Sequence, residues 1–539
     1  MTAWRFEWLE AEHSTNSRTL FLRFAAITIL ILAGFRILHQ VLFHVTALDA
    51  TDYFSPIILV AAAKNLDFSI IVLLLSLALL IQRKKLNWSN LDETGRVRVA
   101  LTVVVAASSW TFATYETNLY YNQSHTLDRL LLLLAPLLVY RHPSFILFYL
   151  VQGTLIVHQF HHPIPGYSWL DKRILFDVAV LFLVFLYARM FVRIPIELCV
   201  ALIIALMAAN YYIPGIAKLR TPWVSVDQLH NLTLATYWNG WLGSIPEARL
   251  LGWIEAAKWV NRPLVVLTLI LELGFVAVLW RRRLFVFLML GSIGLHLGIL
   301  AASGIFFWKW ITLNIVTMLL VAKWPSPRFL FKPPLFLVGA LATVAAPLYA
   351  GATWLMWYDT NYDSYYEFIG VGDSGEEYSI PRLFFAPYDL IFAQNRFWYL
   401  DEEPRLVGTF GATHSLELTT SLLSAKSADE LDVLREQYGE LRYNAQRSLE
   451  FDEFMRRYFG ALRDGAPKKW YLSRLQPPFH ISSFARPDSY RLQEPLRTVR
   501  VVRQRRLFTN GSVRSFPEEI IREVELLAPA DLESGASSD

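Results

Sequence analysis

The sequence IPIELCVALIIALMAANYYI, residues 194–213, is almost entirely apolar, with Glu197 as its charged residue. Because a helix needs roughly 20 mostly apolar residues to cross the hydrocarbon core of a bilayer, this stretch predicts a transmembrane helix. It continues as PGIAKLRTPW, residues 214–223, where a proline and a glycine precede Lys218. We expect these two residues to break the helix and to free backbone groups around the lysine.

The composition of the whole chain agrees with a membrane protein. Of its 539 residues, 54% are hydrophobic and 18% are charged, against about 25% charged in soluble domains. Aromatic residues reach 14%, as expected where rings anchor at the membrane–water interface. The net charge of +4 gives no indication of nucleic-acid binding, and the single cysteine, Cys199, excludes an intrachain disulfide. We therefore expect a lipid bilayer around this protein and no nucleic acid as its partner.

Eleven segments are apolar enough to be candidates for membrane helices. They cover residues 20–45, 66–82, 99–116, 127–140, 144–160, 173–191, 194–213, 263–280, 284–301, 304–322 and 334–357. The fourth and fifth are short and are separated by Pro143, so they are either tilted spans or a re-entrant pair. The N-terminal residues lack the basic-then-apolar order of a cleaved signal peptide, so the first segment is expected to remain in the protein.

The distribution of Lys and Arg between these segments predicts the orientation of the chain. With eleven spans, the basic connections fall on the same side as the N-terminus, which identifies that side as the cytoplasm. These connections contain Arg83, Lys84, Lys85, Arg96, Arg98, Arg141, Arg189, Arg193, Arg281, Arg282, Arg283, Lys323, Arg328 and Lys332. The alternate connections then face outward and carry most of the membrane-associated histidines.

The composition changes beyond about residue 358, where charge increases and the long apolar runs end. The sequence predicts a helix of mixed charge over residues 427–463. Over residues 499–525 it predicts strands around a turn at Asn510-Gly511. We expect an all-α polytopic membrane domain followed by a small α+β extracytoplasmic domain. The expected parts are a cytoplasmic N-terminus at 1–19, the membrane domain at 20–325, a final membrane segment within 326–357, the soluble domain at 358–527 and a disordered tail at 528–539.

Lys218 is the first candidate for chemistry, because ionisable groups at membrane depth are costly and are functional candidates by default. A partly desolvated amine gives up its charge more readily and becomes a usable base at neutral pH. Trp223, five residues on, and Tyr212, in the preceding helix, are candidates for the wall of a pocket at this point. The alternative is a lysine whose ammonium group extends to the membrane interface.

His125 is the second candidate and lies immediately before the predicted helix 127–140. Ser124 or Thr126 is positioned to cap that helix. The positive end of a helix macrodipole favours neutral imidazole, which can donate or accept a proton. The alternative is an interfacial histidine that is hydrogen-bonded to water.

Glu272 and His296 lie deep in two consecutive apolar segments, and Arg36 interrupts the first segment. Because an unpaired ionisable side chain is costly in hydrocarbon, we expect Glu272 and His296 to lie within reach of each other or of one shared polar partner. Arg36 is a further candidate for such pairing. The alternative to a functional site is a buried structural network.

Metal binding has little support in the sequence. His158, His161 and His162 have a helical spacing compatible with a metal site, but no Cys or Glu completes the set nearby. No phosphate-binding glycine-rich loop, paired-cysteine zinc pattern or nucleophile elbow occurs either. We therefore expect no metal cofactor.

The run Tyr211-x-x-x-Gly215-x-x-Lys218-Leu219-x-x-x-Trp223 resembles the signature of the vitamin K-dependent gamma-carboxylase-like membrane domain, also called the horizontally transferred transmembrane (HTTM) domain. Four other features are similar in kind and in order. They are Phe35-Arg36-Ile37 in the first segment, His125 before a leucine-rich helix, Leu271-Glu272-Leu273 before a basic turn, and His296 before the outer turn at 304–307. The resemblance covers roughly residues 20–325.

This resemblance implies an all-helical fold with a site that opens on the extracytoplasmic side. In the carboxylase, a lysine of this motif deprotonates a quinol, the oxygenated quinol removes a proton from a glutamate side chain, and a histidine stabilises the carbanion. Transferred to this chain, Lys218 is the base, His125 is the charge-stabilising histidine, and His296 is matched by position. The expected contacts of a quinol or quinone are Trp223, Tyr212, Glu272 and Arg36.

The chain also departs from that family, and two main hypotheses stay open; a transporter is a weaker third, because the chain shows no matched pair of broken helices in two halves. Cys199 alone cannot supply the paired-cysteine link of the carboxylase, and the soluble part is much smaller, so binding of a peptide substrate does not follow. The first hypothesis is a carboxylase-like membrane protein with oxidoreductase or carboxylase-type chemistry on a quinone-type lipid. The second is a non-enzymatic membrane protein that acts in the export, immunity or maturation of an extracytoplasmic protein or peptide client through its soluble domain.

Overall fold

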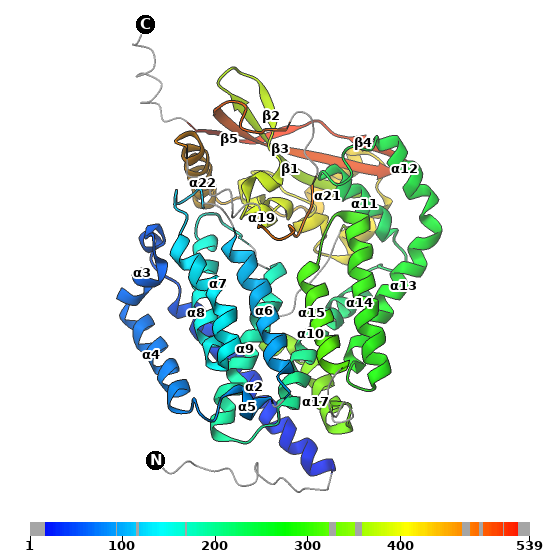
Figure 1. The fold of residues 1–539 in the computed structure, drawn as a ribbon. Helices are drawn as coiled ribbons and strands as arrows, with labels where there is room; N and C mark the ends of the chain where they lie inside the picture. The colour runs from blue at the N-terminus through cyan, green and yellow to red at the C-terminus, as the bar shows by residue number, and fades with distance from the viewer. Residues whose placement is uncertain are drawn as a thin grey trace.

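The computed structural model describes residues 17–92, 94–114, 118–167, 170–322, 330–350, 358–465, 475–483, 489–509 and 511–526. Within these ranges the chain forms a bundle of helices with a C-terminal layer of strands and short helices across one end (Figure 1). The tail predicted at 528–539 lies outside the described residues, as does most of the N-terminal segment predicted at 1–19.

The first half of the bundle is built from residues 17–191. Its helices are α2 (Ser17–Val45), α3 (Ile58–Lys64), α4 (Leu66–Ile81), α5 (Trp88–Leu91), α6 (Arg96–Ala113), α7 (Thr126–Arg141), α8 (Ile146–His161) and α9 (Leu170–Phe191), with 3-10 turns η1 (Ala50–Phe54) and η2 (Pro143–Phe145). Local sequence sets several of the boundaries. At the start of α4, for example, the Asn65 side chain accepts a hydrogen bond from the Phe68 N–H at 3.1 Å, as an N-cap residue does.

The second half begins with the helix that contains the sequence quoted at the outset. Its elements are α10 (Ile196–Leu219), α11 (Gln228–Trp238), α12 (Glu247–Ala256), α13 (Lys258–Gly274), η3 (Phe275–Ala277), α14 (Arg282–Ser303), α15 (Trp308–Ala322), α17 (Pro333–Val344) and α18 (Ala346–Tyr349). Helix α14 ends at Gly304, whose φ of 70° is readily adopted by glycine. A Cβ at this position would lie 2.4 Å from the ring of Trp241, so the turn also needs the missing side chain.

Seven of the described helices are long and apolar enough to cross a membrane: α2, α6, α8 with η2, α9, α10, α13 with η3, and α14. Helices α3 and α4 meet at an angle of 99° and make an eighth span if the bent pair is counted as one. Helices α15 and α17 are apolar but shorter. These helices indicate a membrane protein and confirm the prediction of a helical membrane domain, whereas the number of eleven segments stays a prediction.

The helix break predicted at Pro214-Gly215 is wrong. Helix α10 continues through both residues to Leu219 and places Lys218 in its last turn. A Cβ added to Gly215 would lie 3.0 Å from the Cβ of Glu272, so the glycine allows α10 and α13 to approach closely. An internal proline removes a backbone hydrogen bond, and the packing of neighbouring helices is what makes such prolines tolerable in membrane segments.

The C-terminal layer contains one antiparallel sheet. Its strands are β1 (Tyr362–Gly372), β2 (Glu377–Ser379), β3 (Leu496–Thr509), β4 (Ser512–Ser515) and β5 (Glu519–Glu525). Strand β1 pairs with β2 and β3, and β3 also pairs with β4 and β5. The hairpin predicted around Asn510-Gly511 is confirmed, because Thr509 and Ser512 face each other in the ladder; Asn510 itself lies outside the described residues.

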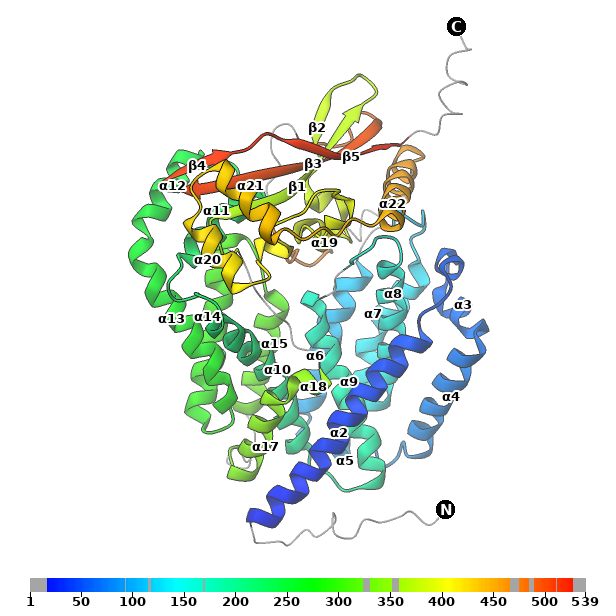
Figure 2. The same ribbon diagram turned by 180° about the vertical axis from the view of Figure 1, so that it is seen from behind.

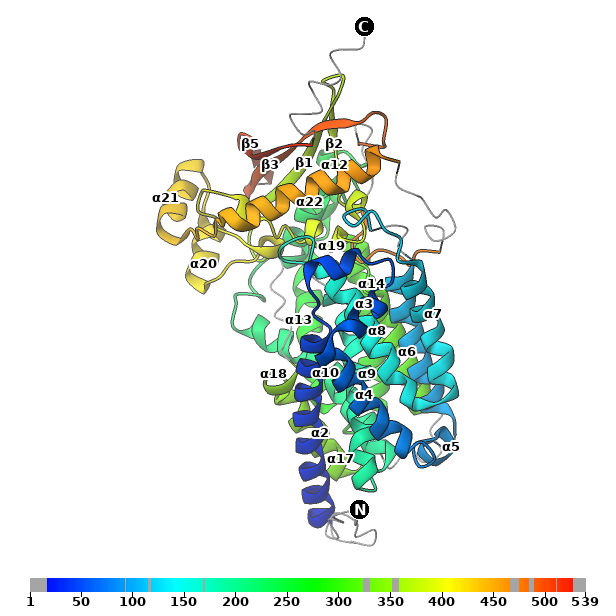
Figure 3. The same ribbon diagram turned by 90° about the vertical axis from the view of Figure 1, so that its left-hand side faces the viewer.

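Short helices pack around this sheet. They are η4 (Arg382–Phe385), α19 (Asp389–Ala393), η5 (Trp398–Leu400), η6 (Thr409–Gly411), α20 (Leu416–Ser424), α21 (Ala428–Tyr438) and α22 (Ala445–Arg463). The mixed-charge helix predicted over 427–463 is therefore two helices. The side chains of Ser427 and Asn444 cap α21 and α22 respectively, and α22 lies beside the sheet (Figure 3).

The connections between the helices lie at two opposite ends of the bundle (Figure 2). At one end, five connections contact the C-terminal layer. These contacts join Phe54 to Arg457, Asn118 to Tyr388, Gly166 to Arg396, Asn239 to Arg382 and Ile305 to Ile481. Helices α11 and α12 also belong to this end, because their residues Leu234, Trp238, Leu250 and Ile254 pack with Tyr365 of β1.

The basic connections lie at the other end, with the N-terminal end of α2 (Figures 1 and 2). There the ring of His142 is 3.1 Å from the carbonyl oxygen of Arg83. Arg189 donates to the carbonyl of Asn90 at 2.9 Å, and Arg282 donates to that of Ala322 at 3.1 Å. Guanidinium groups thus satisfy carbonyls where helices end, which is a common stabilising contact.

Candidate functional site

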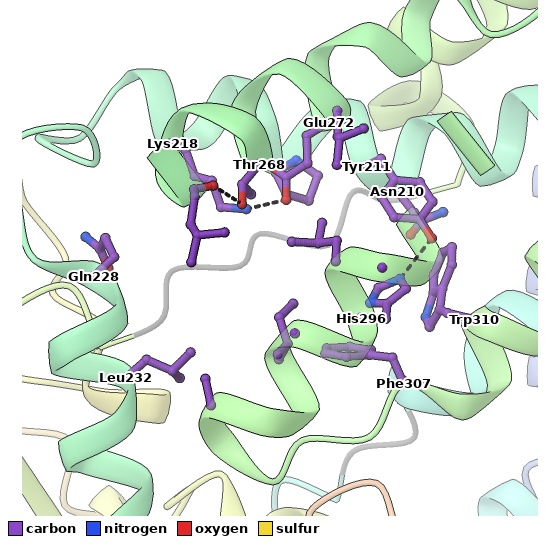
Figure 4. Close-up of a pocket in the computed structure, with 18 of the residues that line it drawn as sticks. Asn210, Tyr211, Lys218, Gln228, Leu232, Thr268, Glu272, His296, Phe307 and Trp310 are labelled. Carbon is purple, nitrogen blue, oxygen red and sulfur yellow. Dashed lines mark hydrogen bonds and ion pairs between the residues drawn. The ribbon is translucent and has the colours of Figure 1, made fainter. Parts of the chain in front are cut away.

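A cavity of about 540 Å³ lies in the second half of the bundle, with α10, α13 and α14 in its walls (Figure 4). Cavities of roughly 300–1,000 Å³ are typical of sites that enclose a small molecule. Most of the lining side chains are apolar, including Leu264, Val265, Leu271 and Phe287. The polar side chains among them therefore stand out as candidates for orientation and chemistry.

Lys218 and Glu272 form the first polar pair of this cavity. Lys218 lies in the last turn of α10 and donates a hydrogen bond to Oε1 of Glu272 in α13 (Figure 4). The two residues are 8% and 6% exposed. Oε2 of Glu272 has no hydrogen-bond partner among the described residues. Because desolvation can offset the attraction between two buried charges, this ion pair is weak evidence for stability.

Tyr211, His296 and Asn314 form the second polar group. The Tyr211 hydroxyl lies 2.9 Å from Nε2 of His296, and Nδ2 of Asn314 donates to the same hydroxyl at 2.8 Å. Asn314 also donates to Oγ of Ser292 at 3.0 Å. Nδ1 of His296 is buried without a partner among the described residues. The imidazole ring is thus held by a hydrogen bond at Nε2, and Nδ1 is able to form a further hydrogen bond.

The prediction for Glu272 and His296 is therefore half right. Both side chains line the same cavity, as residues that are expensive in hydrocarbon should if they serve a site. Their hydrogen bonds go to different partners, however: Glu272 to Lys218, and His296 to Tyr211. No direct hydrogen bond between Glu272 and His296 is seen, because Lys218 and Tyr211, two turns apart on α10, bind them separately.

Trp223 lies in the cavity wall, where it was predicted. Nζ of Lys218 is 4.8 Å from the centroid of its ring, within the range of a cation–π contact. Tyr212 is not among the lining residues, because one step along a helix turns a side chain by about 100° away from its neighbour. Arg36 is not among them either, since its guanidinium donates to the carbonyl of Leu348. The prediction that Tyr212 and Arg36 contact this site is wrong.

Glycines of α14 give the cavity much of its room. Gly291, Gly294 and Gly298 all line it, and they follow one another at helical spacing. A Cβ at Gly294 or Gly298 would meet no heavy atom within 4 Å. The wall of α14 therefore has open space at Gly294 and Gly298, between side chains such as Leu295 and Ile299 that also line the cavity.

His125 does not line this cavity, so the predicted common site of Lys218 and His125 is wrong. His125 precedes α7 with a φ of 45° and is buried in the first half of the bundle. Its Nε2 is 3.1 Å from the carbonyl of Tyr53, and the Gln159 side chain reaches its ring at 2.9 Å. The shared side of the bundle was predicted from chain order, but packed helices determine which cavity a side chain reaches.

Sequence reasoning missed a third polar group of the cavity, on α9 and α2. Arg173 and Asp177 line the cavity and form an ion pair at 3.4 Å. His39 of α2 lies 3.6 Å from the same carboxylate. An acid and a base four residues apart in an apolar run are a signal that the sequence contains.

The C-terminal layer closes the cavity at one end. Leu390, Gln394, Phe410 and His480 all line it, although they follow the membrane helices by many residues. His480 is tied to the bundle by the Phe306 N–H, which donates to its carbonyl at 2.7 Å. No local sequence pattern distinguishes these residues, so this closure could not be predicted.

The histidines at the end of the bundle that contacts the C-terminal layer do not gather into a metal centre within the described ranges. The described residues contain no group of three or more His, Cys, Asp or Glu side chains placed to hold a metal ion. His158, one of the three histidines noted in the sequence, instead lies 2.9 Å from the carbonyl of Phe43. Its ring therefore has a backbone partner.

The fold and this cavity define the chain as a helical membrane protein with a largely apolar cavity between its helices and a C-terminal layer, and with a few polar side chains in the cavity wall. Comparison with known proteins finds no matching family model, no matching curated protein and no matching solved structure.

Proposed function

We propose that this chain is an integral membrane enzyme similar to the vitamin K-dependent gamma-carboxylase-like (HTTM) domain, and that its cavity binds a quinone-type lipid. The observation that supports this is the meeting of Lys218, Glu272, His296 and Trp223 in one largely apolar cavity. The unpartnered Oε2 of Glu272 and Nδ1 of His296 suit the hydroxyl or carbonyl oxygens of such a ring. The open space at Gly294 and Gly298 of α14 suits the ring or an isoprenoid chain.

The chemistry proposed for the chain is proton transfer through the Lys218–Glu272 pair. A bound quinol supplies an acidic hydroxyl and a redox-active ring at this point. Lys218 becomes a neutral amine when its proton moves to Glu272, a step within the hydrogen bond that leaves the total charge of the pair unchanged. The amine then accepts the hydroxyl proton, so that Lys218 is the base and Glu272 the residue that sets its protonation.

The same proposal includes eleven membrane segments, with a cytoplasmic N-terminus and an extracytoplasmic C-terminal layer. It is supported by the position of the basic connections at the end of the bundle that also holds the N-terminal end of α2. Reporter fusions at residue 90 and at residue 400 should report opposite sides of the membrane. Reports from the same side would contradict the topology but not the cavity.

The direct test is mass spectrometry of lipids extracted from the purified protein. We expect a quinone at close to one molecule per chain in the wild type. Gly298→Leu should reduce this content at least about tenfold, because its side chain extends into the cavity without meeting a neighbouring atom near its Cβ. Gly252→Leu is the matched control, since this exposed glycine of α12 is equally unobstructed but lies away from the cavity.

The role of Lys218 is tested separately from binding. Lys218→Arg keeps a positive charge beside Glu272 but cannot readily release a proton. We therefore expect it to retain bound quinone and to lose consumption of a reduced quinol under air, followed by quinone absorbance. Wild-type turnover in this variant would identify Lys218 as an anchor and not a base. Purified protein without quinone but with a co-purifying protein would favour the second hypothesis, a non-enzymatic partner of an extracytoplasmic client.

A further inference from the structure

A second cavity, of about 320 Å³, lies in the C-terminal layer next to the first one. Its lining includes Arg396, Arg405 and Arg442, with Glu440 and the half-exposed His414. Three guanidinium groups thus share the pocket with one carboxylate. Such an excess of positive charge in a concave, partly buried site favours an anionic occupant.

Arg405 is the most informative of these residues, because it is buried with only 6% exposure. Its Nη2 donates to the carbonyl and to Oγ of Ser364 at 2.9 and 3.0 Å, and its guanidinium lies 4.5 Å from the ring centroid of Tyr366. Its Nε and Nη1 have no hydrogen-bond partner among the described residues. A buried guanidinium with two unsatisfied N–H-bearing nitrogens is costly unless an acceptor is supplied from outside.

Arg503 of strand β3 is a buried arginine of the same layer that has a structural role. It is 3% exposed and forms ion pairs with three carboxylates, those of Asp401, Glu403 and Glu519. Among the described residues, the hydrogen bonds of the Arg405 side chain go to Ser364 and not to a carboxylate. The chain thus surrounds Arg503 with carboxylates, whereas Arg405, whose charge also acts on the buried Asp363, lies in the wall of a pocket.

The rim of the pocket positions the other two arginines. Arg442 donates to Glu440 at 2.7 Å and lies 4.6 Å from the ring centroid of Trp398. The backbones of Glu440 and Arg405 are joined by two hydrogen bonds, of 2.9 and 3.0 Å, so the rim is fixed to the buried floor. Arg396 reaches the carbonyl of Gly166 with Nη1 at 3.4 Å and has Nε without a partner among the described residues.

The wall between the two cavities is thin. Gln394 and Phe410 line both of them. Phe410 has a φ of 56°, a left-handed conformation that is unfavourable for a residue with a side chain, and Gly411 follows with a φ of 69°. The chain thus holds a strained loop where the arginine pocket meets the membrane cavity.

We propose that this pocket binds an oxyanion, the phosphate or carboxylate group of a small ligand, through Arg405, Arg396 and Arg442. Planar guanidinium groups with unpaired N–H donors match the oxygens of such groups, and Arg405 is the anchor because its position is fixed by burial. This site is separate from the proposed quinone site and does not depend on it. The oxyanion belongs either to a free solute or to the headgroup of a lipid.

Isothermal titration calorimetry on the full chain in detergent tests the proposal. The probes are inorganic phosphate and succinate as free oxyanions, and dioctanoyl phosphatidic acid as a lipid-borne phosphate. We expect saturable binding of at least one probe with one molecule per chain. Tighter binding of the lipid than of phosphate identifies a headgroup, whereas binding of phosphate or succinate without the lipid identifies a free solute.

Variants locate the site. Arg405→Gln should weaken binding at least about tenfold, because the neutral amide loses the charge-assisted hydrogen bonds that a guanidinium group donates to an oxyanion. Arg442→Gln, at the exposed rim, should weaken it several-fold without disturbing the buried layer. Arg435→Gln is the matched control, since Arg435 forms exposed ion pairs with Glu403 and Asp432 away from the pocket. Failure of all three probes to bind, or equal binding by the wild type and both pocket variants, would overturn the proposal.

Discussion

The buried carboxylates Asp128 and Glu272 show how differently the two halves of the bundle use an acidic side chain. Asp128 of α7 accepts hydrogen bonds from the N–H groups of Ile58 at 2.7 Å and Leu59 at 3.3 Å, and from Gln152 at 3.1 Å. Both of its oxygens are used, and the start of α3 is capped. Glu272 of α13 bonds to Lys218 through one oxygen, and its other oxygen has no partner among the described residues.

The cost of burying a charged side chain therefore does not by itself identify a functional residue. Both carboxylates are costly to bury. The rule that ionisable residues within the membrane are functional candidates therefore selects both of them. Asp128 is explained by its hydrogen bonds to backbone and amide groups, whereas the ion pair of Glu272 with Lys218 leaves one carboxylate oxygen for the proposed site. His125, one turn before Asp128 and bonded to Gln159, belongs with the structural case.

The comparison is tested most strongly by removing one member of the Lys218–Glu272 pair. Glu272→Leu should lower the free energy of unfolding by about 3–5 kcal/mol, because it leaves a buried ammonium unpaired. The double variant Lys218→Met/Glu272→Leu should recover most of this loss while abolishing bound quinone. The measurement is unfolding of the detergent-solubilised protein by titration with a denaturing detergent.

The exposed pair Lys258 and Glu255 provides the control for that experiment. Lys258→Met/Glu255→Leu should change the free energy of unfolding by less than about 1 kcal/mol, because both side chains are largely in solvent. If Lys218→Met/Glu272→Leu is as unstable as Glu272→Leu, the ion pair of Lys218 and Glu272 itself stabilises the fold. The contrast with Asp128 would then be lost.

Asp363 of β1 is a buried carboxylate of the C-terminal layer, and it extends the comparison beyond the bundle. Burial raises its pKa from 3.8 to about 6, against the opposing charges of Arg382, Arg506 and Arg405. Because its folded pKa lies above the unfolded value, the folded state holds the proton more tightly. The contribution of Asp363 to stability is therefore most favourable below about pH 4, and it declines as the pH rises to about 6.

The expected size of this decline is about 3 kcal/mol, from roughly 1.4 kcal/mol for each pH unit between the two pKa values. Asp363→Asn does not titrate, so its stability relative to the wild type should rise by that amount between pH 4 and pH 7. Denaturant titrations of both proteins across this range measure the difference. A difference that does not vary with pH would mean that Asp363 is ionised in the fold with a normal pKa.

Asp128→Ala tests the structural side of the comparison. It should cost about 2–3 kcal/mol, because the N–H groups of Ile58 and Leu59 lose their acceptor. The quinone content of the purified protein should not change, since Asp128 does not line the cavity. A loss of quinone with unchanged stability would place Asp128 among the functional carboxylates.

The sequence predicts which residues are costly to bury, and this explains why Lys218, Glu272 and His296 could be chosen in advance, with Trp223 chosen as a ring five residues after Lys218. Each lies in or beside an apolar run, and the cost of burial is a local property. Their partners could not be chosen, because the contact of Lys218 with Glu272 depends on how closely α10 and α13 pack at Gly215. His125 was misassigned for the same reason, since chain order gives the end of the bundle but not the cavity.

The fold was predictable to a similar depth. Apolar runs located the helices, and Asn510-Gly511 located the hairpin of β3 and β4, because both signals are short-range. The proline in α10 predicts a break in the helix, but packing against neighbouring helices overrides this local preference. The pocket around Arg405 has no signal in the sequence, since a buried arginine is recognised only from its surroundings.

The smallest expected effect is that of Tyr211→Phe, at about 1 kcal/mol. The ring keeps its packing on Phe275, where the centroids are 4.1 Å apart, so the loss is limited to hydrogen bonds of the hydroxyl with His296 and Asn314. Tyr187→Phe, which removes a hydroxyl that donates to the carbonyl of Leu75 at 3.1 Å, should cost about the same. The two variants should differ in bound quinone, which falls only for Tyr211→Phe because this hydroxyl holds the imidazole in the cavity wall. A loss above about 3 kcal/mol for Tyr211→Phe alone would show that its network supports the fold, as that of Asp128 does.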